Sequence, residues 1–79
     1  MSYALFPRGW IVVSHRPGGR KEHYTPEMLD EETFLALALG HREEIQVAVD
    51  NLAHRLGSRI DAVCDGQLVA RSEGEAVGV

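Results

Sequence analysis

The chain has 79 residues, of which 44% are hydrophobic and 25% charged; this is the composition of one small globular domain and excludes a disordered chain. Its single cysteine, Cys64, excludes an internal disulfide framework and fits a reducing cytoplasm, and no run of about 18 apolar residues offers a membrane span. The formal net charge of -4 argues against non-specific binding to nucleic acid, where neutralisation of phosphates dominates affinity.

The first predicted element is a β-hairpin. Residues 10–15 are β-branched and aromatic, as is typical of a strand, and Pro17-Gly18-Gly19 supplies a turn. Residues 20–24 return as a polar second strand. Because that strand is charged and the first is apolar, we expect it at the edge of a sheet.

Two helices are predicted next. The first begins at Thr25 or, one turn later, at Asp30, and its apolar run up to Gly40 predicts a buried central helix. Gly40 either ends this helix or only kinks it. Residues 41–56 have the clearest helical periodicity in the chain, and Gly57 follows where a C-cap is expected.

A second hairpin closes the predicted domain. Residues 59–64 and 67–71 flank Asp65-Gly66, a strong turn signal that would set Val63 opposite Leu68 and Ala62 opposite Val69. The order ββααββ predicts an α+β fold over residues 1–71, with an antiparallel sheet packed on the helices and a flexible tail at 72–79. The predicted core consists of Trp10, Val12, Phe34, Leu35, Ala38, Ile45, Ala48, Val49, Leu52, Leu56, Val63 and Leu68.

No pattern in the sequence predicts an enzyme, a metal site or a cofactor. His15 and His23 would lie on paired strands, but the spacing of the other residues does not predict a third ligand for a metal ion. Asp65 follows Cys64 directly, and its charge would raise the pKa of the thiol and disfavour the nucleophilic thiolate. The sequence therefore favours a protein that acts by binding.

Two charged surfaces are candidates for that binding. Residues 1–21 hold four basic residues and no acid, whereas the rest of the chain holds four arginines and all 12 acids. The first candidate is an acidic helical face, which would dock on a basic partner: Glu31, Glu32, Glu43, Glu44 and Asp50. The alternative is the basic hairpin at 8–24, with Arg16, Arg20 and Lys21.

In general character the chain resembles the small anti-CRISPR proteins encoded by phages and mobile elements. The resemblance lies in its size, its compact α+β domain, its acidic cluster between Glu27 and Glu44 and its lack of a catalytic motif. It covers the whole chain without a shared motif, so it assigns no role to any residue. It implies an inhibitor in the cytoplasm of a bacterial host, which binds a CRISPR effector complex and blocks recognition of target DNA.

Two other functions stay open at this stage. One is a homo-oligomeric accessory protein for structure or assembly, whose dimer contact would use the apolar positions Leu37, Leu39 and Val47. The other is a nucleic-acid-binding module that uses the basic hairpin at 8–24.

Overall fold

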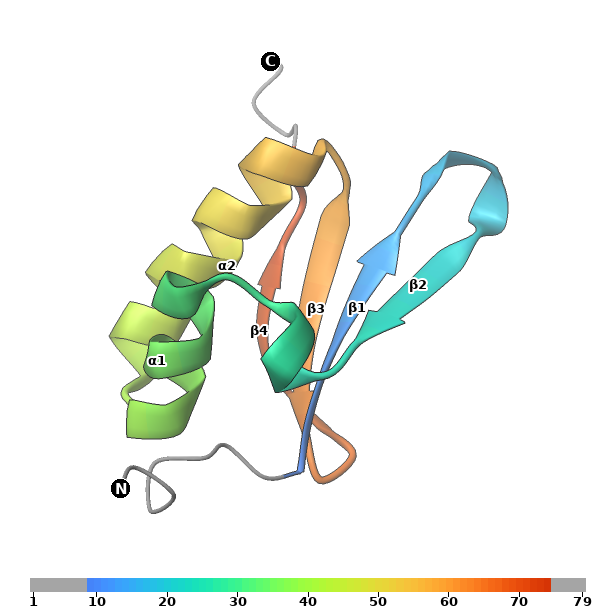
Figure 1. Ribbon diagram of the computed structural model, residues 1–79. Helices are drawn as coiled ribbons and strands as arrows, with labels where there is room; N and C mark the ends of the chain where they lie inside the picture. Colours follow the sequence, from blue (N-terminus) through green and yellow to red (C-terminus); the bar gives the residue numbers. More distant parts are fainter. Residues whose placement is uncertain (1–8, 75–79) are drawn as a thin grey trace.

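A computed structural model describes residues 9–74 as a four-stranded antiparallel sheet with two helices on one of its faces (Figure 1). The strand order is β2-β1-β3-β4. The strands are β1 (Trp10–His15), β2 (Lys21–Tyr24), β3 (Arg59–Cys64) and β4 (Gln67–Ser72), and the helices are α1 (Glu31–Leu39) and α2 (Arg42–Leu56). The α+β class and the order ββααββ are thereby confirmed. The predicted domain start at 1–8 and the last five positions of the predicted tail, 75–79, lie outside the described residues.

The first hairpin has both predicted strands, although β2 begins at Lys21 and not at Arg20, and this polar strand does lie at an edge of the sheet. In the second hairpin, Asp65 and Gly66 have φ of 49° and 83°, the positive values that a two-residue type I′ turn requires. Val63 pairs with Leu68 as predicted. The predicted pairing of Ala62 with Val69 is wrong, because an irregularity between Ala62 and Val63 shifts the register and pairs Ala62 with Ala70.

Helix α1 begins at the second of the two predicted starts. Residues Pro26–Met28 form a short 3-10 turn of their own, and Asp30 then caps α1 by accepting hydrogen bonds from the Thr33 backbone at 3.1 Å and from the Thr33 hydroxyl at 2.8 Å. Gly40 ends the helix in the left-handed conformation, with φ of 75°. The helical region is therefore broken at Gly40 and not merely kinked.

Replacement of Asp30 by alanine should lower the free energy of unfolding by about 1–2 kcal/mol, because the amide of Thr33 loses its cap. The variant also loses the contact of 2.9 Å between Arg55 Nη2 and the carboxylate. Urea denaturation measures the change, and Asp30→Asn is the control because asparagine caps helices about as well as aspartate. Equal losses in both variants would show that the charge, and not the cap, stabilises the helix.

The core lies between the sheet and α2, and α1 packs on α2 and on the 3-10 turn (Figure 1). The prediction that α1 is the central helix is wrong: α2 contacts β3 and β4 directly, whereas Leu35 and Leu39 of α1 are exposed. The buried apolar side chains are Val12, Ala36, Leu37, Ile45, Ala48, Val49, Leu52, Ala53, Ile60, Ala62 and Ala70.

Seven of the 12 predicted core residues are absent from that buried set, so the core prediction is wrong for these seven. Leu35 and Leu68 are exposed. The other five are half-buried: Trp10, Phe34, Ala38, Leu56 and Val63. The prediction for α2 is confirmed, because Ile45, Ala48, Val49 and Leu52 are all buried. No helix within the described part of the chain is both long and apolar enough to cross a membrane.

Candidate functional site

The helical layer carries a groove of about 510 Å³ between α1 and α2. Its apolar surface comes from Leu35 and Leu39 of α1 and from Val47 of α2, and these side chains are 41%, 52% and 56% exposed. A small monomeric domain rarely leaves several large apolar side chains in contact with water at one place unless something binds there. The groove is therefore the first candidate for a contact surface.

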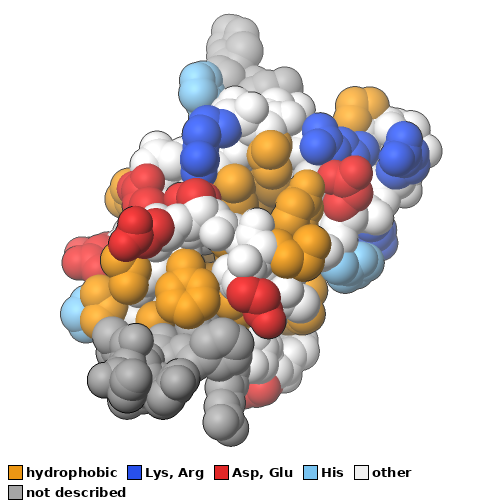
Figure 2. Space-filling model, viewed as in Figure 1, with side chains coloured by type: hydrophobic (Ala, Val, Ile, Leu, Met, Phe, Trp, Pro, Cys, Tyr) orange, Lys and Arg blue, Asp and Glu red, His pale blue; other side chains and the backbone are white. Residues whose placement is uncertain are grey.

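Three carboxylates border this apolar surface. Glu32 lies on α1, and Glu43 and Glu44 lie in the first turn of α2, where the helix dipole favours negative charge. Asn51 Nδ2 donates to Glu32 Oε2 at 3.3 Å, and His41 Nδ1 lies 3.7 Å from Glu44 Oε1. Figure 2 shows acidic and apolar side chains side by side over the helices, which gives this layer a negative charge around an apolar centre.

The predicted acidic site is thus only partly brought together. Glu32, Glu43 and Glu44 line the groove, whereas Glu31 and Asp50 are exposed on the same helices but do not line it. The sequence pointed to Leu39 and Val47 only as positions for a dimer contact, and the prediction that Leu35 lies in the core is wrong because Leu35 lines the groove. The exposure of Val47 could be predicted because this residue lies off the apolar stripe of α2. Which apolar side chains of α1 line the groove, in contrast, depends on how the two helices pack.

The predicted basic site lies at the loop that joins β1 to β2. Arg16 is tied into the structure, because its Nε donates to Glu22 Oε1 at 3.1 Å and its Nη1 donates to the Leu56 carbonyl at 3.4 Å. Hydrogen bonds from the Tyr24 hydroxyl and from Arg16 hold the pKa of Glu22 below its ordinary value. Arg20 and the neighbouring lysine, Lys21, are exposed.

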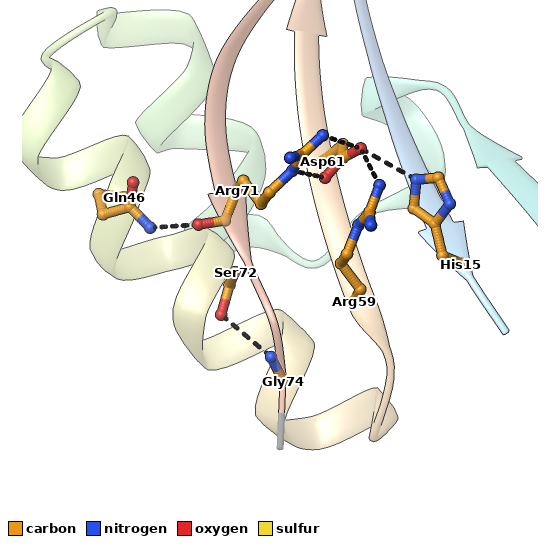
Figure 3. Close-up of polar contacts among 7 residues, drawn as sticks. All are labelled: His15, Gln46, Arg59, Asp61, Arg71, Ser72 and Gly74. Atoms are coloured by element: carbon orange, nitrogen blue, oxygen red, sulfur yellow. Dashed lines mark hydrogen bonds and ion pairs between the residues drawn. The ribbon is translucent and has the colours of Figure 1, made fainter. Parts of the chain in front are cut away.

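A buried carboxylate on the sheet was not predicted. Asp61 lies on β3, on the face away from the helices, and is 7% exposed. Arg71 Nε donates to Asp61 Oδ1 at 2.8 Å and Arg71 Nη2 donates to Oδ2 at 3.2 Å (Figure 3). Arg59 Nη2 donates to the same Oδ2 at 3.3 Å, and His15 Nε2 lies 2.9 Å from it.

This arrangement keeps Asp61 ionised. Burial alone would raise the pKa of the Asp61 carboxyl, but the hydrogen bonds from Arg71, Arg59 and His15 outweigh burial and lower it below the ordinary value. The pKa of Arg71 is raised in turn, chiefly by its hydrogen bond to Asp61. Asp61 is therefore a fixed negative charge that organises three basic side chains around it.

Neither a metal-binding cluster nor an activated thiol is found among the described residues. Residues 9–74 contain no group of three or more His, Cys, Asp or Glu side chains placed to hold a metal ion. His15 and His23 share a face of the sheet, but the register sets His15 opposite Lys21 and not opposite the other histidine. Burial and the neighbouring Asp65 raise the pKa of the Cys64 thiol, which disfavours the thiolate that a nucleophile needs.

Comparisons of the chain with protein-family models, with curated proteins and with solved structures found no match.

Proposed function

We propose that the chain is a non-enzymatic binding protein that docks through the groove between α1 and α2 on a basic surface of a protein partner. One observation carries this proposal: exposed Leu35, Leu39 and Val47 form an apolar centre, and Glu32, Glu43 and Glu44 surround it with negative charge. An apolar centre supplies affinity, while a charged rim selects partners of opposite charge and speeds their association.

The class of partner follows from the general resemblance to anti-CRISPR proteins. We propose a CRISPR effector complex of a bacterial cytoplasm, whose Lys- and Arg-lined channel for nucleic acid offers the positive charge that the groove selects. A carboxylate rim seated in such a channel repels the phosphates of target DNA, and the bound protein also occupies their place. The expected effect is loss of recognition of target DNA without any covalent change.

The test is a competition experiment with purified CRISPR effector complexes and labelled target DNA. The wild-type protein should abolish binding of the DNA by at least one complex, and Glu43→Lys with Glu44→Lys should weaken that inhibition roughly tenfold or more. The matched control is Glu31→Lys with Asp50→Lys, which makes the same change in charge at exposed positions outside the groove. Val47→Asp should also abolish inhibition, because it places a carboxylate in the apolar centre.

Three outcomes would contradict the proposal. The first is that no complex responds to the wild-type protein. The second is that both pairs of substitutions weaken inhibition equally, because the effect would then come from net charge and not from the groove. The third is that the protein is a dimer by light scattering and that Val47→Asp makes it monomeric. That result would assign the groove to a second copy, as in the homo-oligomeric alternative, with Leu39 and Val47 available for such a contact and Leu37 excluded because it is buried.

A further inference from the structure

The face of the sheet away from the helices has an organised pattern of side chains that the proposed docking site does not use. Paired residues of an antiparallel sheet point to the same face, so the register defines rows across the strands. One row is Lys21 of β2, His15 of β1 and Arg59 of β3. The next row crosses all four strands, from His23 through Val13 and Asp61 to Arg71. We call this surface the open face.

The open face is positive although the chain is acidic. Lys21, Arg59 and Arg71 carry three positive charges in these two rows against the single negative charge of Asp61, which leaves +2. Glu73 lies just past the end of β4 and acts on Arg71, so its negative charge flanks one end of the rows and not their centre. The two helices carry a net negative charge, with five acids against two arginines, whereas these two rows of the sheet carry a net positive charge.

The arginines on this face have N–H donors that Asp61 does not use. Asp61 accepts from Arg71 at both oxygens, and Oδ2 is shared with Arg59 and His15, so the carboxylate is saturated. A guanidinium has five N–H donors, and the Arg59 Nε is buried without a hydrogen-bond partner among the described residues. Both arginines are nevertheless partly open to solvent, at 37% and 44%. A phosphate, which has several acceptor oxygens, would accept hydrogen bonds from the N–H groups that these two side chains expose to solvent, whereas the buried Arg59 Nε lies out of its reach.

The rest of the open face offers surfaces on which planar groups can stack. Imidazole rings and guanidinium planes both stack on nucleobases, and the rows supply His15, His23 and the two arginines. Beyond them, a third row of Ile11, Val63 and Leu68 is apolar, and Leu68 is 49% exposed. A flat face that joins cations to stacking and apolar side chains suits a single strand, because it offers contacts to both the phosphates and the splayed bases.

We propose that the open face binds single-stranded nucleic acid, with Lys21, Arg59 and Arg71 on phosphates and the histidines and the apolar row against bases. This site is separate from the groove between α1 and α2, and the proposal does not depend on the partner proposed for that groove. It places the candidate basic surface differently from the sequence analysis. Lys21 keeps its role, but the other two cations come from β3 and β4 and not from the hairpin at 8–24.

The experiment is fluorescence anisotropy of labelled 15-nucleotide oligouridylate and oligothymidylate at low salt. Lys21→Glu should weaken binding about tenfold, because one charged contact is lost and a repulsion takes its place. Arg42→Glu is the matched control: it makes the same change in charge at an exposed position on α2, and we expect unchanged affinity. The slope of log affinity against log salt should also fall by about 0.7 in Lys21→Glu, the value for one phosphate contact to a single strand.

Two further probes separate nucleic acid from other ligands. An abasic strand with the same phosphates should bind at least about fivefold more weakly, because stacking is lost. Polyglutamate with the same net charge as the oligonucleotide should compete poorly for the open face. Equal binding of the abasic strand or equal competition by polyglutamate would overturn the proposal in favour of a general polyanion site. The proposal would also be overturned if the protein bound neither oligonucleotide, or if Lys21→Glu and Arg42→Glu lost the same affinity. If the protein self-associates and Lys21→Glu abolishes this, the open face belongs to a second copy of the chain.

Discussion

Replacement of Leu37 by alanine should lower the free energy of unfolding by about 2–5 kcal/mol. Leu37 is 2% exposed and belongs to the core in which α1 meets α2, so truncation removes buried methyl groups and leaves a cavity. A domain of this size loses about 4–8 °C of melting temperature per kcal/mol, and thermal unfolding followed by circular dichroism measures the change. If the variant fails to fold, Leu37→Met keeps the volume and should cost less than about 1.5 kcal/mol.

The matched control is Leu35→Ala, two positions earlier on the same helix. Leu35 is 41% exposed and lines the groove, so its truncation should cost about 1 kcal/mol or less. This pair of variants tests the orientation of α1, since the sequence analysis placed Leu35 in the core and the structure places Leu37 there. A larger loss for Leu35→Ala than for Leu37→Ala would show that Leu35, and not Leu37, lies in the core.

The reason why α1 could not be oriented from the sequence lies in its composition. Residues 34–39 are apolar at every position, so no periodicity distinguishes the side of the helix that faces α2 from the side that faces water. Helix α2 was predictable, because Ile45, Ala48, Val49 and Leu52 recur at helical spacing between polar residues. Both hairpins were predictable for a similar reason, since local turn chemistry at Pro17-Gly18-Gly19 and at Asp65-Gly66 fixes them.

The candidate surfaces were predictable only in part. Exposure of the glutamates followed from their charge, but the packing of α1 against α2 decides that Glu32 meets Glu43 and Glu44 around a groove while Glu31 does not. The open face depends on a pairing between β1 and β3 that no local signal specifies. Asp61 is an acid in a strand whose neighbours Ile60 and Ala62 are buried, and its partners come from three strands. The sequence could not show that they converge.

Asp61 is the residue for which the structure predicts the largest electrostatic effect. Asp61→Asn removes the charge and leaves Arg59, Arg71 and His15 around a neutral amide, so the free energy of unfolding should fall by about 2–4 kcal/mol at neutral pH. The loss stays below that of a fully buried ion pair, because the two arginines are partly exposed and water can solvate them. Asp50→Asn is the control: it removes an exposed carboxylate on α2 and should change stability by less than about 0.5 kcal/mol.

The same carboxylate should make stability depend on pH in a defined direction. Because the pKa of Asp61 in the folded protein lies below its ordinary value of 3.8, the charge stabilises the fold fully above that value. Its contribution is lost as the pH falls through the lower pKa of the folded state. The pKa values of Glu22 and Asp30 are lowered as well, so the wild-type curve alone does not isolate Asp61.

The difference between wild type and Asp61→Asn does isolate it. Urea denaturation of both proteins should give a clear difference in stability at about pH 5, and this difference should shrink below about pH 4. Protonated Asp61 and the asparagine amide are then both neutral, and the two proteins carry the same excess of positive charge around this position. A difference that stays constant down to about pH 2.5 would show that asparagine destabilises the sheet by its shape, and that the three basic side chains do not depend on the charge of Asp61.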